Sequence, residues 1–173
     1  MPSFYISEQD EVRSKLKTLC QVSISEDGWT HCYKDENNNE EWLLTSHNSE
    51  HHGGGYLILK KLPRPAIDEV INIALTSNNK NDIVGAIYDL LDRERENKEN
   101  FRLKLIQRLK IYIAANPSSF DKERVKLIVH QCELLDNRNR REIMGKHYTE
   151  IEKDSEYFQI ISNEAKSILT SIT

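Results

Sequence analysis

The stretch WTHCYKDENNNEEWLLTSHNSEHHGGG, residues Trp29 to Gly55, decides how the first third of the chain folds. Residues 29–34 and 41–45 are short runs with aromatic and β-branched side chains, which favour strands. The polar segment 35–40 between them contains Asn37-Asn38-Asn39, and Asn tolerates left-handed backbone. Together these features predict a β-hairpin.

The sequence on either side extends this hairpin into a small module. Residues 7–10 open a short helix, whose apolar positions recur at near-helical spacing: Val12, Leu16, Leu19 and Cys20. After the glycines, the apolar run 56–59 predicts a strand, which Pro63 and Pro65 bring to an end. We therefore expect residues 1–64 to form an α+β module, with an N-terminal helix and a small antiparallel sheet of about three strands.

The remainder of the chain has a helical period of apolar residues. This period marks five segments, 67–74, 83–91, 105–113, 125–135 and 151–172. Short connections between them predict antiparallel neighbours. We expect residues 65–173 to form an α-helical segment, either a bundle or a short α-solenoid.

The charge of the chain is unevenly distributed. The 173 residues carry a net charge of −4, from 24 Lys and Arg against 28 Asp and Glu. Residues 25–50 contain seven acids and one base, Lys34, which gives this segment a net charge of −6. Such a surface repels nucleic-acid phosphate and attracts basic partners. We therefore expect no nucleic-acid binding, although acids on a solvated loop also have no function beyond solubility in many proteins.

Cysteine use and hydropathy favour a cytoplasmic protein. The three cysteines are widely spaced without a CxxC pair, which predicts neither a disulfide framework nor a zinc site. The segment after Met1 lacks a basic start followed by an apolar run, so we expect no secretory signal. No apolar stretch approaches the roughly 20 residues that cross a bilayer, so we expect no membrane contact.

Three chemical motifs deserve comparison with simpler explanations. His47, His51 and His52, with Glu50 or Asp35, are possible metal ligands, but no HExxH or HxH pattern accompanies them. The triple glycine 53–55 precedes a strand, whereas a phosphate-binding loop precedes a helix. Cys32 lies next to His31, but neighbours in a strand face opposite sides. We therefore expect no catalytic residue, no cofactor and no metal.

The aromatic residues of this segment suit either a core or an interface. Trp and Tyr are preferred interface anchors, and Trp29, Tyr33, Trp42 and Tyr56 are all candidates. A small sheet nevertheless needs some of them to pack against the first helix. We expect Trp29 and Trp42 to hold the sheet as core residues, and His52 to hydrogen-bond the turn formed by the glycines.

The order of these residues also carries a resemblance to a known family. Along the chain stand a helix, Trp29, Tyr33-Lys34-Asp35, Trp42, Ser49-Glu50-His51-His52 and Gly53-Gly54-Gly55. Over residues 8–62 this order and spacing resemble the bacterial immunity proteins of polymorphic-toxin systems known as immunity protein family 27. Asn37-Asn38-Asn39 replaces the tight Asp-Gly turn of that family, and Ser46-His47 stands where the family has Tyr-Pro.

The resemblance implies a cytoplasmic antidote that binds and blocks a cognate toxin domain without catalysis. An acidic surface fits this role, since a nuclease toxin, one candidate partner, is basic where it grips nucleic acid. We predict that the toxin contacts are Asp35, Glu36, Glu40, Glu41 and Glu50. Two alternatives stay open: a helical scaffold or adaptor that binds a peptide or protein, and a small metal-dependent enzyme that uses the histidines.

Overall fold

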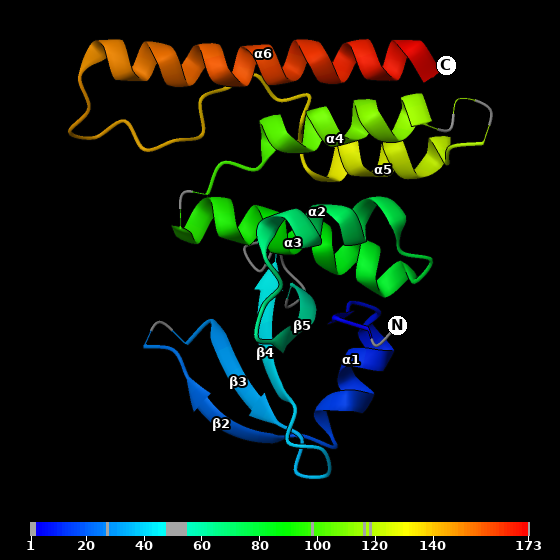
Figure 1. Cartoon of the computed structure of the whole chain (residues 1–173). Coiled ribbons are helices and arrows are strands. Elements are labelled where there is room, and N and C mark those ends of the chain that lie inside the picture. The colour runs from blue at the N-terminus through cyan, green and yellow to red at the C-terminus, as the bar shows by residue number, and fades with distance from the viewer. Residues whose placement is uncertain are drawn as a thin grey trace. The chain divides into compact units, whose positions relative to one another are not determined.

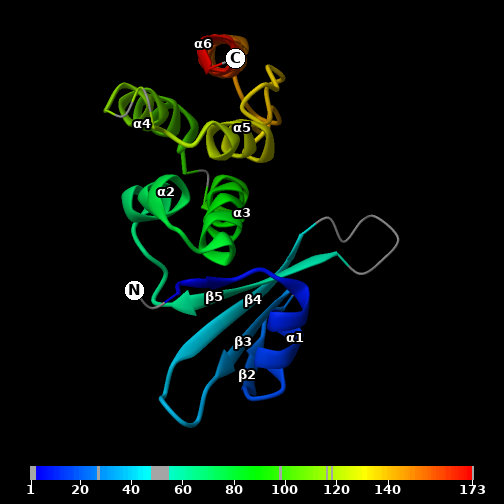
Figure 2. The same cartoon turned by 90° about the vertical axis from the view of Figure 1, so that its right-hand side faces the viewer.

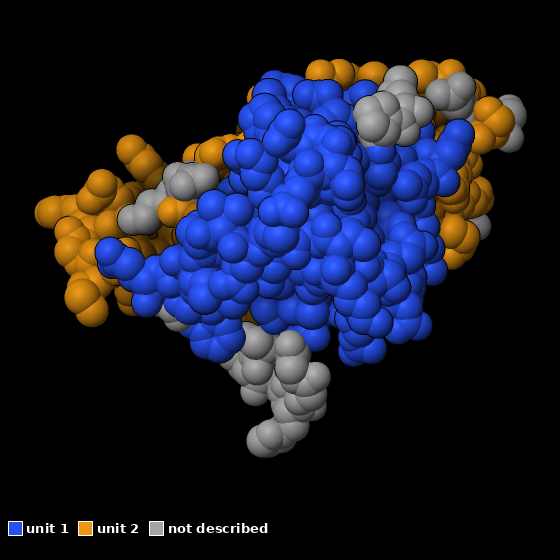
Figure 3. Space-filling model, turned by 90° about the horizontal axis from the view of Figure 1, so that it is seen from below, with its two compact units in different colours: residues 1–92 blue, residues 93–173 orange. Residues whose placement is uncertain are grey.

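The computed structural model describes residues 3–26, 28–47, 55–97, 99–115, 117 and 119–172. Its elements are five strands and six helices within these residues, which confirms the predicted α+β class. The chain divides into two compact units, unit 1 (residues 1–92) and unit 2 (residues 93–173) (Figure 3). Each unit is described by itself below.

Unit 1 is built on one antiparallel sheet. Its strands are β1 (Tyr5–Ile6), β2 (Cys20–Ile24), β3 (Thr30–Lys34), β4 (Glu41–His47) and β5 (Tyr56–Leu62). They are arranged in the order β1-β5-β4-β3-β2, so β1 and β2 are the two edges. The three predicted strands correspond to β3, β4 and β5. The prediction of about three strands with a helix first is wrong, because β1 precedes the first helix and β2 follows it.

Both missed strands are edges of the sheet. β1 has only two residues, and all five side chains of β2 are exposed. Cys20 was expected on the first helix, but α1 (Gln9–Leu16) ends four residues before it. The Glu8 side chain accepts a hydrogen bond from Glu11 N at 2.9 Å and caps the start of α1. The helix therefore begins where the polar residues predict, and its predicted extension to Cys20 is wrong.

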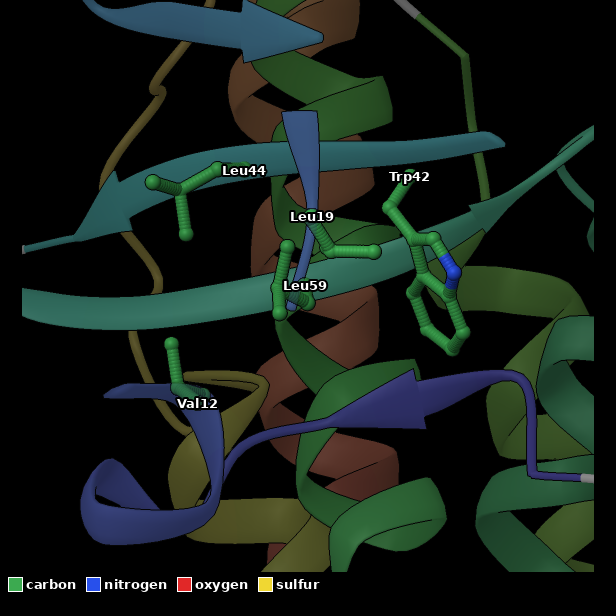
Figure 4. Close-up of a cluster of buried hydrophobic side chains, with 5 residues drawn as sticks. All are labelled: Val12, Leu19, Trp42, Leu44 and Leu59. Carbon is green, nitrogen blue, oxygen red and sulfur yellow. The ribbon is translucent and has the colours of Figure 1, made fainter. Parts of the chain in front are cut away.

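One face of the sheet packs against α1. The pairing of Leu44 with Leu59 places both on this face, and Trp42 shares it because strand residues two apart point the same way. Val12 from α1 and Leu19 complete a buried apolar cluster with these three residues (Figure 4). This cluster fixes α1 on the sheet, since burying large apolar side chains is the main favourable term in folding.

On the opposite face, Lys60 of β5 and Tyr5 of β1 contact α3 (Lys80–Asn97), whose residues up to Asp92 belong to unit 1; α2 (Ile67–Thr76) precedes α3 in the same unit. These helices lie near β1 and β5, while β2 and the far end of β3 extend away from them (Figures 1 and 2). Tyr5 of β1 is buried and lies against Gly85 of α3, where an added Cβ would come within 2.2 Å of the Tyr5 Cβ. Glycine is needed here for close approach.

Unit 2 is helical. It contains the last turns of α3, then α4 (Arg102–Ala115), α5 (Lys122–Gln131) and α6 (Tyr148–Ile172). Beyond residue 65 the described residues contain no strand, as the sequence predicts. α4 and α5 both contact α6. The compact units meet at residues 92 and 93, and a boundary after residue 64 stays a prediction about sequence modules.

Arg102 organises this unit. It is fully buried, donates to both carboxylate oxygens of Glu94, and donates through Nη1 to the carbonyls of Cys132 and Glu133 at 3.1 and 3.0 Å. Its guanidinium lies over the rings of Phe101 and Phe158. One planar cation therefore joins α3, the end of α5 and α6.

No helix among the described residues has the length and apolar character that crossing a membrane requires.

Candidate functional site

The β3–β4 loop is the first predicted site, and Asp35 builds it. The Asp35 side chain is only 5% exposed, accepts from Asn37 N at 3.0 Å, and pairs with Lys15 Nζ at 2.6 Å. The hydrogen bond from Lys15 lowers the pKa of this carboxyl. Asn39 has a φ of +58°, the left-handed conformation that the Asn run predicts. Asp35 therefore shapes the turn and is not presented to solvent.

Glu40 is also engaged within unit 1. It forms an ion pair with Lys61 of β5, and the hydrogen bond from Lys61 lowers its pKa. Both Glu40 and Asp35 have their charges compensated by lysines of the same unit. The predicted acidic surface is therefore less negative than the sequence count indicates.

Glu36 in the β3–β4 loop and Glu41, the first residue of β4, are exposed acids. Glu36 lies beside Cys20 at the start of β2, where its hydrogen bond with the thiol and its negative charge raise the pKa of Cys20. Glu41 lies opposite Lys34 in the β3–β4 pairing. Glu50, the fifth predicted contact residue, lies outside the described residues.

The two tryptophans have different environments. Trp42 is 4% exposed and belongs to the α1-side cluster, whereas Trp29 is 60% exposed between β2 and β3. The expected core position of Trp29 is therefore wrong. Tyr33 is half-buried against the α1-side cluster and donates through Oη to Gln21 Oε1 at 3.4 Å. The sheet needs one tryptophan in its core, and the other faces solvent.

Sequence reasoning missed an apolar surface on β2. Val22 is 65% exposed and Ile24 is 52% exposed, close in the chain to the exposed Trp29. A signal was present, because apolar and polar residues alternate in Cys20-Gln21-Val22-Ser23-Ile24. Alternation predicts a strand with one apolar face, but the register shift between Gln21 and Ser23 places Cys20 opposite Lys34 and Ile24 opposite His31, on different faces of the sheet. Among the described residues, Val22 and Ile24 are left largely exposed.

The glycine-rich loop lies largely outside the described residues, which exclude His52, Gly53 and Gly54. Its two ends are described. His47 ends β4, Tyr56 begins β5, and both rings contact Tyr88 of α3, with centroid distances of 4.6 and 5.6 Å. Gly55 has a φ of +75°, which favours glycine. The ends of the loop are thus held on α3 by an aromatic stack.

A buried ionic network lies between β5 and α3. Lys60 is fully buried, pairs with Asp92, and lies 3.4 Å from Asp89 Oδ1. Arg64 Nη2 donates to Asp89 Oδ1 at 2.5 Å, and Tyr5 Oη donates to Asp89 Oδ2 at 3.1 Å. Burial raises the pKa of Asp92, but the His47 hydrogen bond and the Lys60 charge outweigh it and hold the pKa at about 2.

This network lacks the geometry of a catalytic triad. His47 Nε2 lies 3.2 Å from Thr45 Oγ1 and 3.2 Å from Asp92 Oδ2, so the hydroxyl and the carboxylate share one ring nitrogen. A triad needs them on opposite nitrogens, with the hydroxyl open to substrate. Thr45 is itself buried. The arrangement instead matches the buried Lys60 and the partly exposed Arg64 to two buried carboxylates, which anchors α3 to the sheet.

The possible metal ligands include one described histidine, His47, and two that lie outside the described residues, His51 and His52. Among the described residues, no group of three or more His, Cys, Asp or Glu side chains is placed to hold a metal ion. His51 and His52 lie outside them, so the alternative of a metal site that uses these residues stays open, against the prediction of no metal. His47 has its Nε2 directed at Thr45 and Asp92.

Comparison with known proteins supports the resemblance seen in the sequence. Residues 8–63 match the family described as Immunity protein 27. The match covers α1 and the strands β2 to β5, which hold the α1-side core and the exposed surface on β2. The curated proteins gave no match. The solved structures gave none either.

Proposed function

We propose that this protein is an immunity protein that binds a cognate toxin domain and neutralises it without catalysing a reaction. The match of residues 8–63 to the Immunity protein 27 family carries this proposal. The same segment forms β2, whose five side chains are all exposed among the described residues, and the β3–β4 loop. A toxin domain is the partner that such a family implies.

The charge of unit 1 supports a basic partner. Residues 1–92 contain 8 Lys and Arg against 15 Asp and Glu, a net charge of −7, whereas residues 93–173 carry +3. Opposite charge raises association rates and suppresses wrong partners. A nuclease toxin is one candidate, because its active surface must attract phosphate. Binding would take place in the cytoplasm, with neither nucleic acid nor membrane as partner.

The exposed acids Glu36 and Glu41 are the best candidates for direct contacts. Asp35 and Glu40 act behind them, because their lysine partners hold the loop in shape. Glu50 stays a proposed contact on the strength of the sequence. Trp42 holds the core, and we retain for His52 and the glycines 53–55 the proposed role of fixing their loop.

The test begins with the protein encoded immediately upstream. Its C-terminal domain, expressed with this chain, should co-purify as a stoichiometric complex. The double reversal Glu36→Lys with Glu41→Lys should weaken the complex in calorimetry. Reversing Glu40 is a poor choice, since a lysine there would face Lys61. The matched control is Glu152→Lys with Glu156→Lys, two exposed acids of α6. Equal affinity of both double variants and wild type would contradict an acidic interface.

A helical scaffold is the second candidate, and one observation favours it. Ile111 and Met144 of unit 2 are 60% and 85% exposed, so this unit also presents apolar side chains. Full-length Ile111→Ser and Met144→Ser variants discriminate the two functions. A toxin-binding unit 1 predicts unchanged affinity for both variants, whereas loss of partner binding would favour the scaffold.

A further inference from the structure

We infer that the outer edge of β2 is where the toxin docks, by adding one of its own strands to the sheet. This inference rests on the proposed function and specifies how that partner is held. Strand addition uses the backbone groups of an exposed sheet edge for affinity and side-chain contacts for specificity.

The two edges of the sheet differ in whether side chains of the protein hydrogen-bond their outward-facing backbone groups. At β1, Asp82 of α3 accepts from the amides of Phe4 and Tyr5, at 2.9 and 3.2 Å. Next to it, Asn81 accepts from the amides of Ser7 and Glu8, at 3.0 and 2.7 Å. Side chains at the start of α3 therefore close this edge. An added strand would have to displace them.

β2 lacks such a closure among the described residues. Its neighbour in the sheet is β3 on one side, and the outer side of Cys20–Ile24 faces no other described strand. Proteins commonly protect exposed edges with lysine or proline within the strand. β2 has neither residue. It keeps one protective feature, a register shift between Gln21 and Ser23, which limits pairing to a strand of matching shape.

Apolar side chains accompany this open backbone. Val22, Ile24 and Trp29 are each more than half exposed, and they lie within a stretch of eight residues. Ile24 lies opposite His31, whose ring stacks on Tyr33 with a centroid separation of 6.4 Å. An edge strand with aliphatic and aromatic neighbours provides the buried centre that a stable interface needs.

The negative charge of unit 1 indicates which kind of partner binds at the β2 edge. Exposed carboxylates mark both ends of the strand, with Glu26 after Ile24 and Glu36 beside Cys20. Pairing β2 with β2 of a second copy would bring together two units of net charge −7, which disfavours a homodimer. A strand from a basic domain gains from the same charges. The partner is therefore a basic toxin domain with a strand at its own surface.

Hydrogen exchange on the full-length chain tests this directly. With the C-terminal domain of the upstream protein bound, the amides of residues 20–25 that do not already pair with β3 or with Thr30 should exchange more slowly than in the unbound chain. The variants Val22→Lys and Ile24→Lys should weaken binding by about tenfold or more, because they place a charge in the apolar centre. Ile111→Lys is the matched control, with the same change at an exposed apolar site of unit 2. Val22→Thr keeps a β-branched residue and should bind almost as well as wild type.

The outcomes separate the two proposals. If the complex forms but residues 20–25 gain no protection, or both lysine variants bind like wild type with unchanged circular dichroism, the edge inference is wrong and the antidote function stands. If the chain alone forms dimers that Val22→Lys abolishes, a second copy occupies the edge and the inference is overturned. If wild type forms no complex with the upstream domain, both proposals fail together.

Discussion

Glu36 and Cys20 are in contact, and the reactivity of the Cys20 thiol provides a test of this contact. The thiol donates to the Glu36 carboxylate, whose charge also repels a thiolate, so the pKa of Cys20 is raised. The thiolate is the reactive form. We therefore expect Glu36→Gln to speed the alkylation of Cys20 by iodoacetamide at pH 8, measured by mass spectrometry of the labelled peptide.

A control for this measurement is present in the same chain. Cys132 is fully buried, and burial raises its pKa to about 12, so it should stay unlabelled in both proteins while they are folded. An equal labelling rate of Cys20 in wild type and variant would contradict the contact between β2 and the β3–β4 loop.

Asp92 links stability to pH. Its folded-state pKa of about 2 lies below the usual 3.8, so the stabilisation is complete above about pH 5 and is lost as the pH falls towards 2. The shift corresponds to about 2 kcal/mol. Asp92→Asn should lower the free energy of unfolding at pH 7 by about 3–5 kcal/mol, because the buried Lys60 loses the nearer of its two carboxylate partners, and should flatten the pH dependence below 5.

Urea unfolding followed by circular dichroism at pH 7, 5, 4 and 3 measures both effects. Asp10→Asn is the control, since the Asp10 side chain is 87% exposed and its pair with Arg13 is a surface one. If Asp92→Asn and wild type lose stability in parallel between pH 5 and 3, the low pKa of Asp92 is wrong.

At the scale of elements, the contact between β1 and α3 depends on a glycine. Alanine in place of glycine within a helix normally stabilises by about 1 kcal/mol. At Gly85 the added Cβ would lie 2.2 Å from the Tyr5 Cβ, so we expect Gly85→Ala to destabilise unit 1 by about 1–3 kcal/mol. Urea unfolding gives the size, and the Tyr5→Gly background should reduce the loss. Stabilisation by Gly85→Ala would contradict the position of β1.

Replacing Arg102 should destabilise the helices of unit 2 in a comparable way. Replacing it with Met leaves the Glu94 carboxylate and two carbonyls without their donor, and we expect a loss of about 3–5 kcal/mol. Arg102→Lys keeps the charge but lacks the planar fork, so it should also destabilise, by less. Arg138→Met, at an exposed ion pair, should cost less than about 1 kcal/mol in the same thermal or urea unfolding experiment.

The elements also show what the sequence could and could not predict. The Asn37-Asn38-Asn39 turn, the strands β3 to β5 and the five helices after residue 66 follow from local pattern, and the structure confirms them. β1 has only two residues and little local signal, whereas β2 has a short apolar–polar alternation that also indicates a strand and that the prediction left out. The partners of Lys60, Asp89 and Asp92, lie 29 and 32 residues away in the sequence. The residues next to Lys60 therefore do not predict that its ammonium group is buried between carboxylates of α3.

The site was less predictable than the fold for the same reason. Five acids were expected to contact the toxin, but pairing with Lys15 and Lys61 occupies Asp35 and Glu40. Such pairs depend on tertiary contacts between α1, β5 and the loop. The open edge of β2 likewise becomes visible only when strand order is known, because the sequence alone does not tell an edge from a central strand.

For the whole molecule, the charge difference between the units predicts how association responds to salt. If unit 1, with its net −7, attracts a basic toxin domain, raising the salt from 0.15 to 0.5 M should slow association more than it speeds dissociation. Stopped-flow or surface plasmon resonance measures both rates. An association rate that does not depend on salt would contradict electrostatic attraction and leave the apolar edge as the main contact.

The central claim is that this chain neutralises a toxin, and survival of cells tests it most directly. The C-terminal domain encoded upstream is induced in a host that carries either the chain or an empty vector. The account predicts arrested growth with the empty vector and restored growth with the chain, with partial rescue by Val22→Lys or Ile24→Lys. Arrest despite folded, abundant wild-type chain would contradict the claim.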